Sequence, residues 1–341
     1  MDTSTLHGAL RDGTLEADVL VGVGIDQLTE RNAAGNTPLH TAAKYGRLHL
    51  LPPAALSVES LLIKNDSGYT PLHHAALGGH LDQIPPALLN ADTLTARSNS
   101  GYTVFHVAAA NGHLDQLPAS LLTDDVVHTR TDLGNTLLHE AAENGTLDRF
   151  PAAFLTHTQL TMPNASGESV LHVAALNGHL DQLAKELLTE ANLLLKTNAG
   201  DTVLHAAAIA GHLQQVPAEI LTHKNLVQSS KSGYTPIHAA AETGQLGKIP
   251  PAVLTADLLL TRNDHGDTPL HAAAYEGHLD QIPRKILTDD LLQVRNYDGV
   301  TPLRTAVRRG FIEQLPAHLQ PKPEGPIKRV LNRLGLSRPP F

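Results

Sequence analysis

Histidine is the residue type in this chain that most invites a chemical role, because the 341 residues include 21 of them. Imidazole nitrogens commonly bind zinc, but two ligands of one ion must lie within about 4 Å of each other. Equivalent residues of adjacent helical layers lie roughly 8–10 Å apart. We therefore expect the recurrent histidines to be structural and the chain to bind no metal. Eight of them recur at 33-residue intervals: His40, His73, His106, His139, His172, His205, His238 and His271.

Other arrangements that support catalysis are missing from the sequence. The chain has no cysteine, which excludes disulfides, thiolate nucleophiles and cysteine-ligated zinc. It contains no GxSxG motif, P-loop or GxGxxG motif before a helix. Carboxylates such as Asp82, Asp115 and Asp181 fall at one repeated position, where a solvated face is expected. We predict that the protein is not an enzyme and uses no cofactor.

The six tyrosines occur at two kinds of position. Tyr69, Tyr102, Tyr234 and Tyr297 lie at expected hairpin tips, and Tyr45 and Tyr275 lie late in an expected helix. Tyrosine is favoured at interfaces because it buries a large area at low entropic cost. Ordinary packing between neighbouring tips is the alternative. For a partner-binding role, specificity would come from the varying residues nearby: Lys44, His74, Asn111, Glu140, Glu143, Asn144, Glu242 and Glu276.

The elements that position these side chains follow from a glycine that recurs every 33 residues, from Gly35 to Gly299. In the second such repeat, Thr70 is a suitable helix N-cap and Pro71 suits the first helical position. His73, at the third position, can reach back to the cap. A pair of alanines then permits close helix packing, and a second glycine ends the helix. An apolar stripe of Leu72, Leu81 and Ile84 is expected to face the next layer.

The strings GNTPLHTAA, GYTPLHHAA, GYTPIHAAA and GDTPLHAAA resemble the signature of the ankyrin repeat family, over residues 2–316. The resemblance implies an all-α, ankyrin-type helical repeat solenoid with hairpin tips, whose concave face and tips bind proteins. Three segments are expected. Residues 1–33 form a degenerate N-terminal capping repeat, residues 34–320 form nine ankyrin-like repeats, and residues 321–341 form a basic, proline-containing tail. Within the tail, IKRVLNRLGL has the pattern of a short basic amphipathic helix.

The second half of each repeat departs from the family pattern, which has one longer helix there. A proline interrupts it at Pro52, Pro85, Pro118, Pro151, Pro217, Pro250, Pro283 and Pro316. Proline inside a helix costs roughly 3 kcal/mol. We therefore predict a split outer helix, with a short turn at 81–84 and a second short helix over 85–89. A turn capped by Thr123 would follow, and the side chains that return from this turn to the core would be Val126, Leu258 and Leu291.

The net charge and the hydropathy of the chain limit its possible functions. The net charge is −9; residues 284–341 carry +6, which leaves −15 on the rest. An acidic body disfavours binding to a nucleic-acid backbone. No signal peptide or membrane-spanning run is visible, so we expect a cytoplasmic protein. We also expect it to be a monomer. The leading interpretation is a scaffold for an unidentified partner protein, with the array spanning the chain from cap to cap. The alternatives are a targeting module of a secreted, host-directed effector, and binding of nucleic acid or an acidic surface through the tail.

Overall fold

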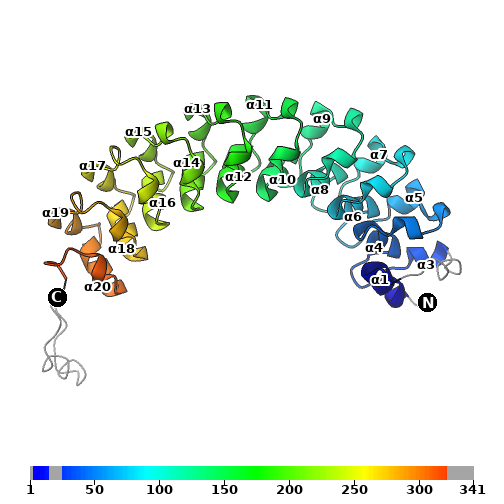
Figure 1. Ribbon diagram of the computed structural model, residues 1–341, viewed down its shortest axis with the longest axis horizontal. Helices are drawn as coiled ribbons and strands as arrows, with labels where there is room; N and C mark the ends of the chain where they lie inside the picture. Colours follow the sequence, from blue (N-terminus) through cyan, green and yellow to red (C-terminus); the bar gives the residue numbers. More distant parts are fainter. Residues whose placement is uncertain (1–2, 15–24, 321–341) are drawn as a thin grey trace, which may run out of the picture. The chain divides into compact units, whose positions relative to one another are not determined.

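The computed structural model describes residues 3–14 and 25–320, and throughout these ranges the chain folds as helices and turns (Figure 1). They contain 19 α-helices and no strand; the pairs Pro163–Ser169 and Lys196–Thr202 form isolated β-bridges. This confirms the predicted all-α helical repeat class. The predictions for the tail concern residues outside the described ranges. None of the helices in these ranges is long and apolar enough to cross a membrane.

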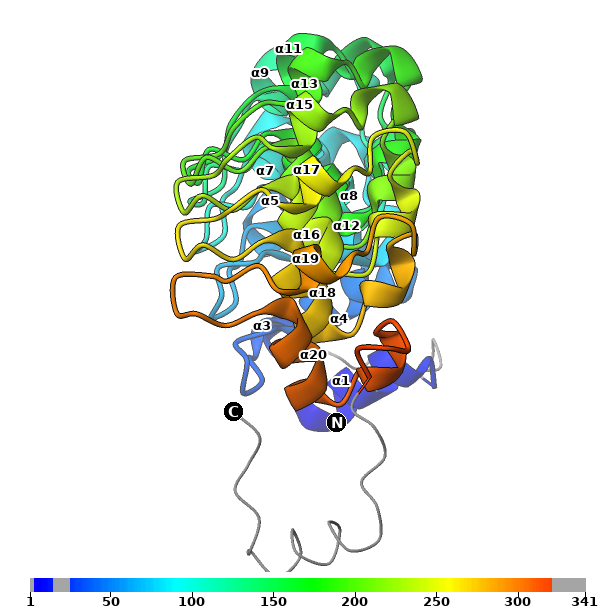
Figure 2. The ribbon, with the colours of Figure 1, turned by 90° about the vertical axis from the view of Figure 1, so that its left-hand side faces the viewer.

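The chain divides into two compact units, Met1–Pro217 (unit 1) and Ala218–Phe341 (unit 2), which we describe separately. In each unit the longer first helices of the repeats pack side by side as one layer. The hairpin tips of each unit project on one side of this layer (Figure 2). In unit 1 the layer comprises α1 (Thr3–Asp12), α4 (Pro38–Lys44), α6 (Pro71–Gly78), α8 (Val104–Asn111), α10 (Leu137–Asn144), α12 (Val170–Asn177) and α14 (Val203–Ile209), and α3 (Ile25–Thr29) contacts α4. In unit 2 it comprises α16 (Pro236–Glu242), α18 (Pro269–Glu276) and α20 (Pro302–Arg309).

The outer layer consists of short elements. One-turn α-helices form its far side: α5 (Val58–Leu61), α7 (Ala91–Leu94), α9 (Asp124–Val127), α11 (His157–Leu160) and α13 (Glu190–Leu193) in unit 1, and α15 (His223–Leu226), α17 (Ala256–Leu259) and α19 (Asp289–Leu292) in unit 2. Three-residue 3₁₀ turns precede these one-turn helices: Leu48–Leu50, Pro53–Ala55, Leu81–Gln83, Pro86–Leu88, Leu114–Gln116, Ala119–Leu121, Leu147–Arg149, Ala152–Phe154, Leu180–Gln182, Lys185–Leu187 and Leu213–Gln215 in unit 1, and Ala218–Ile220, Leu246–Lys248 and Leu279–Gln281 in unit 2. A further 3₁₀ turn, Ile312–Gln314, follows α20. The core lies between the two layers.

Each first helix from α4 to α20 begins at a threonine or serine cap, as predicted. In α6 the imidazole Nδ1 of His73 accepts a hydrogen bond from the backbone N–H of Thr70 at 3.1 Å. With Nδ1 as acceptor, the proton lies on Nε2, which donates to the carbonyl of Tyr102 in the next repeat at 3.1 Å. His73 therefore caps its own helix and also binds the hairpin tip of the next repeat through the Tyr102 carbonyl. The predicted apolar stripe of Leu72, Leu81 and Ile84 is buried, which confirms it.

The proline-split outer segment is confirmed, because no helix runs through Pro85 or Pro118. Pro85 stands at the N-cap of a 3₁₀ turn with φ −52° and ψ 129°, outside the helical region. The predicted helix over 85–89 is shorter than expected, a single turn over Pro86–Leu88. Proline at this boundary gives up no intrahelical hydrogen bond.

The capped turn that follows is a single turn of α-helix. Thr123 caps α9 by accepting a hydrogen bond from the backbone N–H of Val126 at 3.4 Å. The prediction that Val126 returns to the core is wrong, since it is half-buried and the next residue, Val127, is fully buried. Because this turn is helical, the side chain of Val127 and not that of Val126 faces the core. The equivalent predictions for Leu258 and Leu291 are confirmed by their burial.

Candidate functional site

The repeated histidines lie in the interior as structural groups. Burial lowers the pKa of His40, His73, His106 and His139 to about 4, so these side chains are neutral near pH 7. Each donates from Nε2 to a backbone carbonyl at 3.0–3.2 Å. In the ranges that the structure describes, no three His, Asp or Glu side chains form a group that can hold a metal ion.

Four of the predicted partner-binding residues meet in a hollow of about 310 Å³ on unit 1, the tyrosine hollow: Tyr69, His74, Tyr102 and Asn111. It lies over α6 and α8, and Leu77, which is 42% exposed, is part of its wall. Tyr69 packs edge-on against His73, with ring centroids 5.1 Å apart, and Tyr102 packs in the same way against His106. Packing against buried histidines holds both tyrosines in place while leaving them partly exposed.

The polar side chains of the tyrosine hollow differ in whether their hydrogen-bonding atoms have partners. The Nδ1 atom of His74 is buried and has no hydrogen-bond partner among the residues that the structure describes, and burial lowers the pKa of this histidine to about 3. Asn111 donates from its amide to the carbonyl of Val107 at 2.8 Å. Burial, and the nearby carboxylate of Glu140, raise the pKa of Tyr102. Both Tyr102 and His74 therefore stay neutral near pH 7.

Glu140, expected among the varying surface residues, is only 3% exposed. It accepts a hydrogen bond from the amide of Asn135 at 3.0 Å and another from Tyr102, and burial raises its pKa. Glu143 and Asn144, on the same helix, are exposed.

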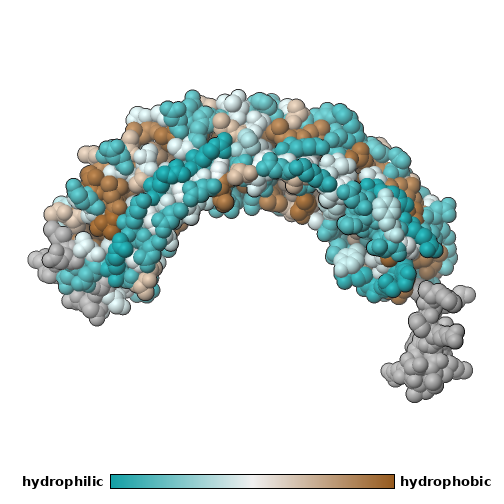
Figure 3. All heavy atoms as spheres, turned by 180° about the vertical axis from the view of Figure 1, so that it is seen from behind, coloured by the Kyte–Doolittle hydropathy of each residue, from teal (hydrophilic) through white to brown (hydrophobic). Residues whose placement is uncertain are grey.

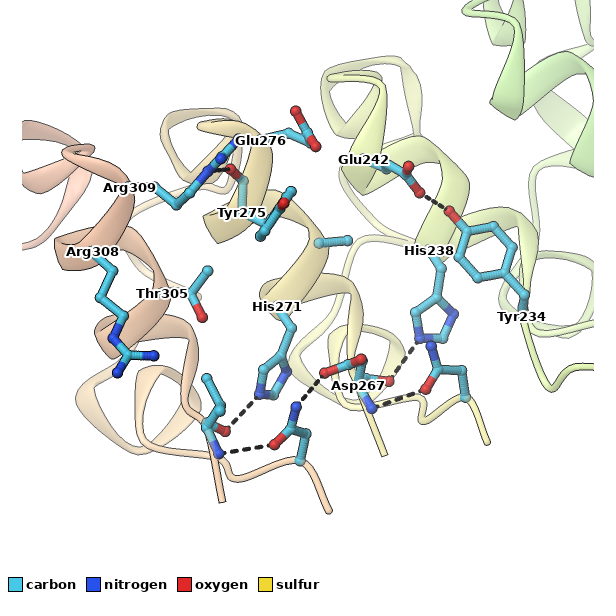
Figure 4. Close-up of a pocket in the computed structure, with 14 residues that line it drawn as sticks. Tyr234, His238, Glu242, Asp267, His271, Tyr275, Glu276, Thr305, Arg308 and Arg309 are labelled. Atoms are coloured by element: carbon cyan, nitrogen blue, oxygen red, sulfur yellow. Dashed lines mark hydrogen bonds between the residues drawn. The ribbon is translucent and has the colours of Figure 1, made fainter. Parts of the chain in front are cut away.

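A second set of predicted residues meets in unit 2, in a groove of about 460 Å³ across α16, α18 and α20 (Figure 4). The hydroxyl of Tyr234 donates a hydrogen bond to Glu242. The guanidinium of Arg309 lies 4.1 Å from the ring centroid of Tyr275, and its Nε donates to the Tyr275 carbonyl at 3.0 Å. Glu276 also lines this unit 2 groove.

Sequence reasoning missed Arg308 and Arg309, which form one wall of the unit 2 groove. The sequence period could have indicated these two arginines. They stand 33 residues after Tyr275 and Glu276 and so occupy the same positions of the next repeat. Acidic side chains on α16 and α18 and basic ones on α20 make the groove bipolar.

The two remaining predicted tyrosines lie elsewhere. Tyr45 is half-buried at the C-cap of α4, in a separate hollow near the start of unit 1, with the ammonium of Lys44 5.6 Å from its ring centroid. Tyr297 is 72% exposed and covers Gly266 of the preceding tip, where a Cβ would lie 2.7 Å from the Tyr297 ring. For Tyr297 the arrangement matches the alternative of packing between neighbouring tips.

Sequence reasoning also missed a hollow of about 210 Å³ over α12 and α14, the acidic hollow. Leu176 and Ile209, 44% and 47% exposed, form its apolar part, and Glu168 and Asp201 line it as well. Leu176 and Ile209 share a repeat position with Leu77, which is the signal that was overlooked. Figure 3 shows rows of hydrophilic residues on each unit, with separate hydrophobic patches beside them.

Comparison with known families agrees with this architecture. A family model described as "Ankyrin repeats (3 copies)" matches residues 6–84, 53–122 and 171–249, and a model described as "Ankyrin repeat" matches residues 265–288. These ranges together cover more than half of the chain, although they do not count its repeats, so the number nine stays a prediction. No curated protein matches the sequence. The capped helices, the 33-residue period and the matched ranges agree, and the chain belongs to the ankyrin repeat family.

Proposed function

We propose that this chain is a non-catalytic scaffold that binds a partner protein through the exposed face of its first helices and its hairpin tips. Ankyrin repeats are generally protein–protein interaction modules and are typically non-catalytic. We further propose that it acts as a cytoplasmic monomer, for which the lack of cysteine fits a reducing compartment.

The tyrosine hollow is the observation that carries the proposal. Two tyrosines, an exposed leucine and a few polar groups form a concave, mainly apolar surface, the composition typical of binding sites. Because Tyr69 and Tyr102 are already packed against His73 and His106, little side-chain entropy is lost when a partner covers them.

The experiment compares partner binding of the full chain with that of the double variant Tyr69→Ala, Tyr102→Ala, using a partner recovered by affinity capture. We expect affinity to fall about 100-fold, since buried aromatic hot spots contribute about 2 kcal/mol or more each and are not additive. Val58→Ala is the control, because Val58 is 36% exposed on α5 in the outer layer. Unchanged affinity in the double variant, with the fold intact by circular dichroism, would refute the proposed site.

A further inference from the structure

The unit 2 groove carries charges of both signs that do not neutralise one another. The exposed residues Glu242 and Glu276 end α16 and α18. The exposed residues Arg308 and Arg309 end α20 (Figure 4). Within the part of unit 2 that the structure describes, neither carboxylate lies within 4.0 Å of a nitrogen of either arginine. All four charges therefore remain available to a ligand.

Arg309 is held in position before any ligand binds. Its guanidinium lies 4.1 Å from the ring centroid of Tyr275, and its Nε donates to the Tyr275 carbonyl at 3.0 Å. The terminal nitrogens of Arg309 have no hydrogen-bond partner among the described residues, so they can bind a carboxylate through two parallel hydrogen bonds. Because this side chain is already ordered, less side-chain entropy is lost when a ligand pairs with it.

The acidic side of the groove is ordered in the same way. The hydroxyl of Tyr234 donates to Glu242, and the amide of Asn296 donates to Oδ1 of Asp267 at 2.7 Å. Burial, and the carboxylate of Glu242, raise the pKa of Tyr234, so its hydroxyl keeps the proton that it donates. A carboxylate that accepts a hydrogen bond stays ionised and still has lone pairs for a cation. The groove is therefore negative over α16 and α18 and positive over α20.

The distance between the two charged sides sets the spacing of the charges in a ligand. Helix α18 packs against both α16 and α20, so α16 and α20 are two helix spacings apart, roughly 16–20 Å. An extended chain rises about 3.3 Å per residue, so about five or six residues span this distance. Tyr275 on α18, which is 52% exposed, lies between the two sides and can pack against the middle of such a segment.

We propose that the unit 2 groove binds an extended segment of a partner protein in which a cationic and an acidic residue are about five or six positions apart. The cationic side chain pairs with Glu242 and Glu276, and the acidic side chain pairs with Arg308 and Arg309. Charge complementarity decides this choice, because one side of the groove repels any ligand of a single charge sign, such as a nucleic acid. The inference rests on the proposed function in one respect, namely that the ligand is a protein.

The test measures, by fluorescence anisotropy at low and high salt, how the full chain binds a labelled nine-residue peptide. This peptide has two lysines at one end, two glutamates at the other and a tyrosine in the middle. Two further peptides have glutamines in place of either the lysines or the glutamates. We expect the two-charge peptide to bind about tenfold more tightly than either of the others, since each of those lacks two exposed ion pairs. Binding should weaken as the salt concentration rises.

Arginine variants assign the positive side. The variant Arg308→Gln, Arg309→Gln should bind the two-charge peptide about tenfold more weakly and no longer distinguish it from the peptide without glutamates. The control Lys248→Gln, Lys285→Gln makes the same change of net charge at exposed positions outside the groove, and should leave both affinities unchanged. If the double variant is unfolded by circular dichroism, Arg308→Gln alone keeps the contact of Arg309 with Tyr275 and should lower affinity about threefold.

Glutamate variants assign the negative side. The variant Glu242→Gln, Glu276→Gln should lower the affinity for the two-charge peptide about tenfold and remove the preference for lysines. The control Asp280→Asn, Asp290→Asn removes the same charge from exposed positions outside the groove and should change neither. A purely structural role of the glutamates would weaken all three peptides by one factor, whereas ion pairing affects only the peptides that carry lysines.

Three results would overturn the inference: no saturable binding of the two-charge peptide, equal affinity for all three peptides, or equal effects of the groove variants and their controls. Peptide binding that depends on the groove, together with a partner that ignores Tyr69 and Tyr102, would refute the proposed tyrosine site and leave the groove intact. A partner that requires Tyr69 and Tyr102, together with no peptide binding, would refute the groove alone.

Discussion

Acidification should unfold unit 1 through its buried histidines. His40, His73, His106 and His139 have a pKa of about 4 in the folded chain because they are buried, against 6.5 for an exposed imidazole. The unfolded chain therefore binds more protons at any pH between these values. Stability is fully present above pH 6.5 and is lost as the pH falls toward 4.

The magnitude follows from the proton linkage. For one imidazole with a pKa near 4 folded and 6.5 unfolded, lowering the pH from 7.5 to 5 costs about 2 kcal/mol of unfolding free energy. Four such residues lose about 8 kcal/mol, comparable to the whole stability of a typical domain. His74, whose pKa is about 3, adds to the loss, and Glu140, whose pKa is raised, opposes it. We expect cooperative unfolding near pH 5.

The assay is urea denaturation followed by circular dichroism between pH 7.5 and pH 5, on the full chain and on His73→Gln. Glutamine can still accept from the Thr70 N–H but not reach the Tyr102 carbonyl in the same geometry, so the variant should be about 1–3 kcal/mol less stable at pH 7.5. Having one fewer buried imidazole, it should lose about 2 kcal/mol less than the parent on acidification.

His157→Gln is the control, because His157 is exposed on α11. It should leave the pH dependence of stability unchanged. Two results would refute the reasoning: stability that is flat from pH 7.5 to 5 in the parent chain, or a pH dependence of His73→Gln identical to that of the parent.

Three further substitutions test the repeat architecture by urea denaturation at pH 7.5. Gly79→Ala should lower the free energy of unfolding by about 1–3 kcal/mol, because Gly79 has φ 72° and a Cβ there would lie 2.7 Å from the His113 ring. If Gly79→Ala costs as much in a His113→Ala chain as in the parent chain, the loss comes from the backbone conformation alone. Thr103→Val should cost about 1 kcal/mol, because the hydroxyl caps α8 by accepting from the His106 N–H at 3.4 Å, and no loss would show that cap to be unimportant. Pro118→Ala should cost about 0.4–1 kcal/mol through the unfolded chain without raising helix content, and a clear gain in helical signal would mean that the proline alone splits the outer segment.

The sequence by itself determined those features of this protein that residues close together in the chain form with one another. Thr70 and His73 form their cap across three residues, and Gly79 ends the same helix nine residues after the cap. Pro85 marks the break in the outer segment for the equally local reason that its ring cannot continue a helix. Such interactions depend on spacing alone, and the 33-residue period repeats them through the array.

The tertiary structure alone decided how side chains from different repeats combine. Glu140 has the sequence position of a surface residue, yet it is buried because Asn135 and Tyr102 satisfy its carboxyl group there. Arg309 covers Tyr275, 34 positions earlier in the chain, and Tyr102 shares one hollow with Tyr69. The period states which positions face one another, but the size, charge and hydrogen-bonding of each neighbouring pair decide whether the result is a buried contact, a bipolar groove or an open apolar hollow.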